Sequence, residues 1–194
     1  PRSRLIPNHA TPIVFTMTRV LGICGSLRKA SKNMGLLRFV QGAGIDGLEL
    51  EIADLSEVPL YNQDIRDRPA AVDRLVAQMA SAEAFLFGCP EYNYSIAPAL
   101  KNALDWGSRE ETSPFAGKAA AMLGAGGGMK TSRAQYHLRQ VCVFLDLHVI
   151  TKPEFFANAF AGAFDDAGTL TDEALQGRAK STVEALLALS ARLR

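Results

Sequence analysis

The chain has 194 residues, of which 48% are hydrophobic and 21% charged. This length and composition exclude a disordered chain and suit one domain of ordinary size. The formal net charge of +1 argues against a broad nucleic-acid-binding surface, and no apolar run approaches the roughly 18 residues of a membrane span. Cysteines and histidines lack the spacing of metal ligands, so we expect no metal site and buried thiols in a reducing, cytoplasmic compartment.

The first sixteen residues carry two arginines and a short apolar patch at residues 13–15. They lack the sustained apolar segment of a signal peptide. We therefore interpret residues 1–16 as a loose extension or an expression remnant, Met17 as a native start, and residues 17–194 as a single domain.

Strand-length apolar runs alternate with helical patterns along the first half of the chain. The run Arg19–Cys24 predicts a strand buried on both faces, and a helical stripe starts at Ser31. The alternation in Leu48–Leu55 predicts a second strand. Pro69 is placed well for the first turn of a helix that reaches Met79.

The second half repeats this alternation. The segments that predict strands are 84–90, 118–128 and 148–156. Helices are predicted over 96–106, with Pro98 in the first turn, over 131–147, and from Thr171 onward. Five strand and helix repeats predict an α/β fold with a parallel sheet covered on both faces, in which ligands bind at the carboxyl ends of the strands.

The loop after the first predicted strand reads GSLRKASKN, Gly25 to Asn33. Because it follows a strand and opens a helix, its backbone N–H groups should converge on an anion. Its short polar side chains and Arg28 are suited to a phosphate. The alternative is that Ser31 only caps the helix and Arg28 is a surface charge.

The loops after the third and fourth strands complete the same edge of the sheet. The third strand leads into PEYNYSIAPALKNALDW, whose Tyr92 and Tyr94 suit a planar ring system, or else pack against their own helix. The fourth leads into GAGGGMKTS, where the backbone can approach a ligand closely. Met129 interrupts the triplet that a P-loop requires, and the dinucleotide fingerprint is also absent.

Together, GSLRKASKN, PEYNYSIAPALKNALDW and SRAQYHLRQ resemble the NADPH-dependent FMN reductases, especially their bacterial quinone and chromate reductase branch. The resemblance covers nearly all of residues 17–194. It implies a flavodoxin-like, doubly wound, five-stranded parallel sheet with strand order 2-1-3-4-5. It also implies that the first loop binds the FMN phosphate, through Ser26, Arg28, Ser31 and Asn33.

The same resemblance assigns the rest of the flavin site. It places Pro90, Glu91, Tyr92 and Asn93 beside the isoalloxazine ring and ribityl chain, and Gly124, Ala125, Gly126 and Gly127 along the other rim. The third loop has a plainer glycine run than the serine-containing loops common in the family. Family members are commonly dimers or tetramers, which implies an interface at Arg133, Tyr136 and Glu154; the alternative is an ordinary helix surface.

The implied function is an FMN-dependent oxidoreductase in which flavin N5 accepts hydride from NADPH or NADH. The reduced ring then passes electrons to a quinone, free flavin, azo compound, chromate or another metal oxyanion in a ping-pong cycle. No catalytic side chain is required. The alternatives are a flavodoxin-type one-electron carrier, which would present an acidic face to protein partners, and an interaction protein that has lost its flavin.

Overall fold

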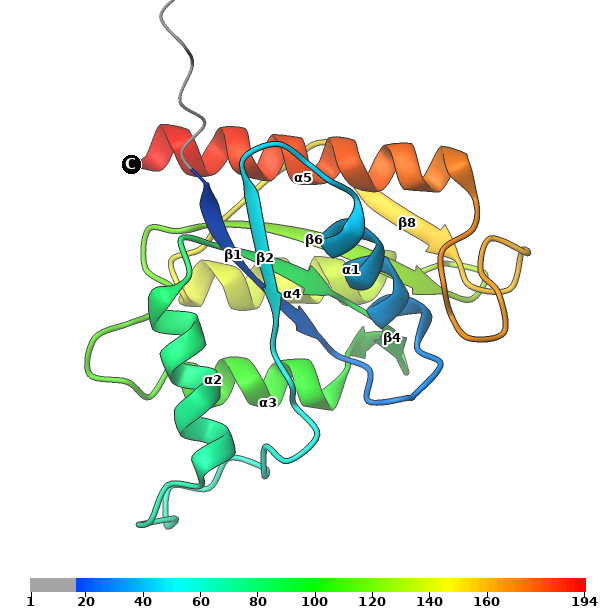
Figure 1. Ribbon diagram of the computed structural model, residues 1–194. Helices are drawn as coiled ribbons and strands as arrows, with labels where there is room; N and C mark the ends of the chain where they lie inside the picture. Colours follow the sequence, from blue (N-terminus) through cyan, green and yellow to red (C-terminus); the bar gives the residue numbers. More distant parts are fainter. Residues whose placement is uncertain (1–16) are drawn as a thin grey trace, which may run out of the picture.

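The structure is a computed structural model that describes residues 17–194 (Figure 1). The interpretation of residues 1–16 lies outside the described residues. A mostly parallel sheet runs through the centre, in the order β2-β1-β3-β6-β7, with β8 also paired to β6. The strands are β1 (Thr18–Cys24), β2 (Leu48–Ile52), β3 (Ala84–Gly88), β6 (Ala119–Gly126), β7 (His148–Val149) and β8 (Phe155–Asn158).

Within residues 17–194, five helices cover both faces of this sheet, as the alternating pattern predicted (Figure 1). On one face, α1 (Lys32–Gly42) and α5 (Glu173–Leu193) share an apolar cluster with the strands. On the other, α2 (Ala70–Ser81), α3 (Pro98–Gly107) and α4 (Ser132–Phe144) share a second cluster. The helices begin one to a few residues later than predicted, since Ser31, Pro69 and Asp172 occupy the N-cap positions.

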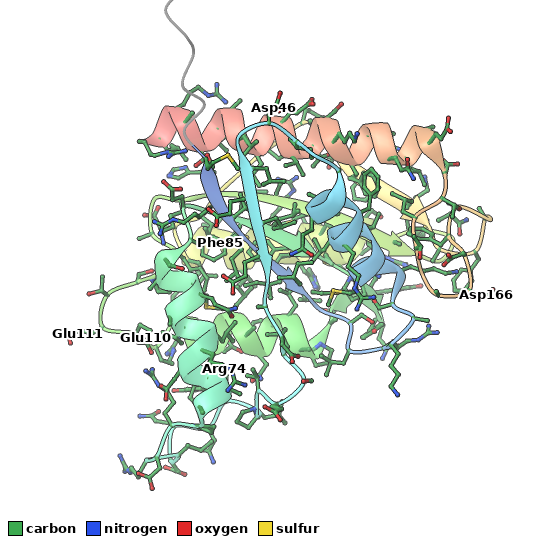
Figure 2. All side chains as sticks on the ribbon, in the orientation of Figure 1. Asp46, Arg74, Phe85, Glu110, Glu111 and Asp166 are labelled. Carbon is green, nitrogen blue, oxygen red and sulfur yellow. The ribbon has the colours of Figure 1, made fainter. Side chains whose placement is uncertain are left out.

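The central strands are buried because helices cover both sides of them. Every residue of β3 is buried, and Phe85 lies in the interior of the molecule, whereas Asp46 and Asp166 lie at its edge (Figure 2). The Phe85 ring contacts the rings of Phe87 and Phe115, with centroid distances of 6.1 and 5.2 Å. This rigid core positions the loops that leave the carboxyl ends of the strands.

The segment predicted as a continuous fifth strand forms two short strands instead. β7 pairs with the beginning of β6, and β8 pairs with its end. Pro153 lies between them, and proline has no N–H to donate to a sheet. The predicted strand order 2-1-3-4-5 is otherwise confirmed, with β7 and β8 together in the fifth place.

The turn predicted after the third strand contains a small hairpin of its own. Its strands are β4 (Glu91–Tyr92) and β5 (Ser95–Ile96), paired antiparallel. None of the helices within residues 17–194 is long and apolar enough to cross a membrane.

Candidate functional site

Three loops meet at the carboxyl edge of the sheet. They leave β1, β3 and β6, which are neighbours in the sheet. The Gly25 N–H donates to the Gly88 carbonyl at 2.8 Å, and the Cys89 N–H donates to the Leu123 carbonyl at 2.8 Å. These hydrogen bonds continue the strand pairing into the loops and hold the three predicted site segments together.

The first loop presents backbone donors at the start of α1. Within residues 17–194, the N–H groups of residues 27–30 donate to no protein carbonyl or side chain. Ser26 is buried beside them, and Arg28 is exposed. The Ser31 hydroxyl accepts a hydrogen bond from the Met34 N–H at 3.1 Å. Ser31 therefore caps the helix, which leaves its hydroxyl hydrogen to donate elsewhere.

Asn33 connects the first loop to the third. Its Nδ2 donates to the Ala125 carbonyl at 3.0 Å, and its Oδ1 accepts from the Ala125 N–H at 2.9 Å. Because both ends of the amide are engaged, Asn33 fixes the spacing between the two loops. Its backbone N–H lies in the first turn of α1, where such groups have no partner within the helix.

The second loop is a tight hairpin whose tip is exposed. Asn93 and Tyr94 have φ values of 48° and 68°, the left-handed pair that a two-residue turn of this kind uses. The Tyr92 and Tyr94 side chains are exposed, and Pro90 is buried against Gly25. A Cβ on Gly25 would lie 2.9 Å from the Pro90 ring, so glycine permits the close approach of the first and second loops.

Glu91 anchors this hairpin to α4. Its Oε2 accepts from the backbone N–H groups of Arg133 and Ala134, at 3.1 and 3.2 Å, at the helix N-terminus. Its Oε1 accepts from the Arg133 Nε at 2.6 Å and also pairs with Nη2. The Glu91 side chain is only 5% exposed. The Arg133 guanidinium lies 3.6 Å from the centre of the Tyr94 ring. The Glu91 carboxylate therefore holds the N-terminus of α4 and, through Arg133, the aromatic tip of the hairpin.

Glycines in the third loop allow neighbouring backbone and side-chain atoms to pack closely against it. A Cβ on Gly124 would lie 2.0 Å from the Thr131 hydroxyl, and one on Gly126 would lie 2.0 Å from the Lys130 carbonyl. Gly127 pairs with Lys130 in an isolated bridge, which leaves Met129 exposed at the tip. The predicted rim, residues 124–127, thus ends β6 directly beside Asn33 and the second loop.

A fourth segment, residues 159–171, also reaches this edge, and sequence patterns did not predict it. Phe160 is exposed and lies beside Gly127. The Lys32 ammonium donates to the Ala159 carbonyl and lies 5.3 Å from the Phe160 ring centre. Phe160 was the available signal, because exposed aromatic groups near a site often contact ligands or partners.

The residues assigned to an interface have different surroundings. Arg133 is engaged by Glu91 within its own chain. Tyr136 is 68% exposed, one turn further along α4. Glu154 pairs with Lys152 at 2.7 Å, and this hydrogen bond lowers the pKa of its carboxyl. Tyr136 is therefore the member of this set whose side chain is most open to a partner.

The thiols are buried, as predicted, and are not part of the site. Burial raises the pKa of Cys24, and it raises the pKa values of Cys89 and Cys142 to about 12. They are therefore protonated at neutral pH and poor nucleophiles. Among residues 17–194, no three His, Cys, Asp or Glu side chains gather in a way that would hold a metal ion.

The geometry fits FMN. Unpaired backbone N–H groups at the start of α1 suit a phosphate, and the aromatic hairpin and glycine rim beside them suit a flat ring. A doubly wound parallel sheet with a ligand site at the carboxyl ends of β1, β3 and β6 defines a flavodoxin-like protein.

Comparisons with known proteins agree with this class. Residues 18–162 match the sequence profile of the NADPH-dependent FMN reductases. The chain is 47% identical over 193 residues to the NAD(P)H:quinone oxidoreductase of Solanum tuberosum, covering 95% of this chain and 97% of the relative. It is also 47% identical over 179 residues to an NAD(P)H-dependent FMN reductase of Pseudomonas aeruginosa, covering 91% and 97%.

A solved structure is similar over the same length. The flavoenzyme NAD(P)H:(acceptor) oxidoreductase FerB of Paracoccus denitrificans superposes with a TM-score of 0.81 at 30% identity, covering 91% of this chain and 98% of FerB. The chain belongs to the NADPH-dependent FMN reductase family. It is an oxidoreductase whose cofactor is FMN and whose electron donor is NAD(P)H.

Proposed function

We propose that this enzyme reduces quinones with electrons from NAD(P)H, in two separate half-reactions. The observation that carries the proposal is the juxtaposition of an anion-binding first loop with an exposed aromatic hairpin and a glycine rim at one sheet edge. The relatives from Solanum tuberosum and Escherichia coli, whose names describe quinone reduction, support this choice of acceptor.

The chain's own residues bind and orient; they do not exchange protons with the substrate. The N–H groups of residues 27–30, with Ser26 and Arg28, hold the phosphate. Pro90–Asn93 and Gly124–Gly127 border the ring on two sides, and Glu91 acts indirectly by fixing the hairpin to α4. Bound FMN supplies the hydride and electron chemistry.

The openness of the site supports a ping-pong order. The hairpin tip, Met129 and Phe160 are exposed around it, so donor and acceptor are expected to occupy the same open face in turn. Double-reciprocal plots of initial rates should therefore give parallel lines. Intersecting lines, with evidence of a compulsory ternary complex, would contradict this order.

The same open face supports the proposal of further acceptors. Free flavins and azo compounds are planar, as quinones are, and need no further contacts. Chromate and other metal oxyanions would be drawn by exposed cations such as Arg28. Arg109, in contrast, hydrogen-bonds the Ser108 hydroxyl and lies 5.8 Å from the Tyr61 ring centre, so its guanidinium has partners within the chain.

The assembly we propose is a homodimer or homotetramer in which α4 forms part of an interface. The exposed Tyr136 supports this arrangement. In this proposal Arg133 takes part in the interface from the position that its ion pair with Glu91 fixes. Glu154 takes part in the interface while it is paired with Lys152.

The decisive experiment is an absorption spectrum recorded after addition of FMN and desalting, then after anaerobic NADPH, then after a quinone. We expect bands near about 370 and 450 nm that NADPH bleaches and the quinone restores. Retained flavin that NADPH does not bleach would instead favour the one-electron carrier. If no flavin is retained after desalting, tight FMN binding is overturned.

A further inference from the structure

An exposed aromatic side chain lies directly outside the glycine rim of the site. β8 pairs with the end of β6, and the Ala159 N–H then donates to the Gly126 carbonyl at 2.7 Å. The next residue, Phe160, is 81% exposed, and a Cβ on Gly127 would lie 3.9 Å from its ring. Phe160 therefore continues the rim outward, and no step of the proposed reaction uses its side chain.

Phe160 is held in place although it is exposed. Its N–H donates to the Asn158 Oδ1 at 2.8 Å, which closes a turn. The Lys32 ammonium donates to the Ala159 carbonyl and lies 5.3 Å from the Phe160 ring centre, within the range of a cation–π contact. An aromatic side chain that is already held in this way loses little conformational entropy when it contacts a ligand.

The segment that carries Phe160 buries its other phenylalanine. This segment, residues 159–171, lies beside the start of α1 (orange in Figure 1). Phe164 is buried in the apolar cluster shared by α1, α5 and the sheet. It pairs with Leu170 in an isolated bridge, and the Thr171 N–H donates to the Ala163 carbonyl at 3.0 Å. The segment thus fixes one phenylalanine in the core and the other outside it, at the mouth of the site.

Met129 gives the rim a second exposed apolar side chain. It is 61% exposed, at the tip of a turn in which the Lys130 N–H donates to the Gly127 carbonyl at 2.8 Å. Gly127 therefore both contacts Phe160 and begins the turn that carries Met129. Single exposed apolar side chains are common on protein surfaces, but these two border one site. Methionine is flexible and polarisable, so this pair can adapt to apolar groups of different shapes.

The acceptor of the proposed reaction has a part that can reach this pair. A quinone head group must lie on the flavin ring to receive electrons, between the hairpin and the glycine rim. A substituent on the head group then leaves the site across one of these borders. Residues 126–128 have no side chains, and a Cβ on Gly128 would meet no atom within 4 Å. A substituent that crosses this border and is apolar would bury surface against Phe160 and Met129.

We propose that Phe160 and Met129 bind an apolar substituent of the quinone, and so make the enzyme prefer quinones that carry a hydrocarbon tail. This proposal rests on the proposed function, because the head group must first lie on the flavin. Lys32 is a positioning residue, which acts through Ala159 and the Phe160 ring. The competing occupants of this surface are FMN itself and a second copy of the chain, and the experiment separates them.

The test compares the double variant Phe160→Ala/Met129→Ala with the unchanged protein on two quinones that share one head group. Coenzyme Q0 has no tail, and decylubiquinone has a decyl tail. We expect the ratio of kcat/KM for decylubiquinone to that for coenzyme Q0 to fall about tenfold, because burial of roughly two methylene groups corresponds to that factor. The value for coenzyme Q0 should stay within about twofold.

The matched control is Val143→Ala/Phe144→Ala. It removes two apolar side chains that are 80% and 76% exposed at the C-terminal end of α4, away from the rim. We expect this control to leave the ratio unchanged. An equal fall of the ratio in both double variants would overturn the assignment to the rim.

A binding measurement tests the contact without turnover. Oxidised, FMN-loaded protein is titrated with each quinone in the absence of NAD(P)H, and the change in the flavin absorption spectrum gives the Kd. We expect decylubiquinone to bind at least about tenfold more tightly than coenzyme Q0, and the double variant at the rim to lose this difference. Equal binding of the two quinones, or a preference that survives in the variant, would overturn the proposal.

Three further outcomes separate the competing occupants and the proposed function. Loss of FMN retention in the rim variant would assign the two side chains to the flavin instead. A smaller assembly of this variant in size-exclusion chromatography would assign them to a contact between copies of the chain. If the unchanged protein binds decylubiquinone selectively, but neither quinone reoxidises the flavin that NADPH has bleached, the proposed function fails while the contact stands.

Discussion

At the scale of single residues, two side chains of the predicted flavin site act on the protein itself. Glu91 accepts hydrogen bonds from the N-terminus of α4 and from the Arg133 guanidinium. Asn33 exchanges two hydrogen bonds with the Ala125 backbone. Both residues therefore position loops, and their replacement should alter stability and flavin affinity together.

Glu91→Gln tests the first contact. Glutamine keeps an oxygen acceptor for the helix N–H groups but loses the charge that Arg133 requires, so we expect the free energy of unfolding to fall by about 1–3 kcal/mol. Urea unfolding measures this change, and flavin fluorescence should show weaker FMN binding. Glu111→Gln, at an exposed loop position (Figure 2), is the control and should change neither. Equal effects of the two variants would remove Glu91 from this role.

Asn33→Ala tests the second contact. It leaves the buried Ala125 N–H and carbonyl without partners, which we expect to lower the free energy of unfolding by about 1–3 kcal/mol. The Kd for FMN should rise because the first and third loops lose their fixed spacing. Gln41→Ala removes an exposed side-chain hydrogen bond to the Leu50 carbonyl and should cost under about 0.5 kcal/mol. An unchanged Kd with lowered stability would limit Asn33 to the fold.

The sequence pattern placed Asn33 where the first strand gives way to a helix and Glu91 in the turn after the third strand, but it did not indicate their partners. Local patterns such as a strand followed by a polar turn indicate where a loop begins. Ala125 lies 92 residues from Asn33, and Arg133 lies 42 residues from Glu91. Contacts over such separations depend on the three-dimensional path of the chain, which a single sequence does not display.

At the scale of elements, α1 depends on a close approach by the segment before α5. A Cβ on Gly35 would lie 1.8 Å from the Gly168 carbonyl oxygen. Gly168 itself has φ +85°, a conformation that other residues rarely adopt. To admit a side chain at position 35, α1 and this segment would have to move apart. That movement would break the contacts of Lys32 with Ala159 and Phe160.

Gly35→Ala should therefore destabilise the protein by about 1–3 kcal/mol, although alanine favours helices. Gly177→Ala is the matched change, because Gly177 is exposed in α5 with nothing within 4 Å of an added Cβ. It should stabilise the protein by about 0.5–1 kcal/mol. Thermal unfolding of both variants measures the difference, and a shift in the same direction for both would contradict the packing argument.

The elements also show where sequence patterns succeed and where they fail. Alternation of strands and helices predicted a parallel sheet covered on both faces, because parallel strands need helical crossovers of one hand. The strand order was implied by the resemblance to the FMN reductases and not by the alternation. The interruption between β7 and β8 was missed, since apolar residues on both sides of Pro153 conceal a break in pairing. The path of residues 159–171 over the site was also missed, because this segment has no periodicity.

At the scale of the whole molecule, buried thiols set a limit at alkaline pH. The ordinary thiol pKa is 9.0, and burial raises the pKa values of Cys89 and Cys142 to about 12 in the folded chain. Between these values the unfolded chain has released protons that the folded chain keeps. The stabilisation is therefore complete below about pH 9 and is lost as pH rises toward 12.

We accordingly expect the free energy of unfolding to decline steadily above about pH 9. The double variant Cys89→Ala/Cys142→Ala lacks these groups, so its stability should fall less steeply over the same range, whatever its value at neutral pH. Urea titrations at pH 7 to 10.5 measure the two slopes. Parallel curves would show that other groups control the alkaline limit.

In the assembly proposed above, the anchoring of the hairpin to α4 would make flavin binding depend on protein concentration. Arg133, which Glu91 holds, and Tyr136, which is open to a partner, are on the same helix one turn apart. A subunit that docks on Tyr136 would stiffen the helix end that carries the flavin loop. Dilution below the dissociation constant of the assembly should then loosen FMN before the fold is lost, and added FMN should restore activity without heating or refolding.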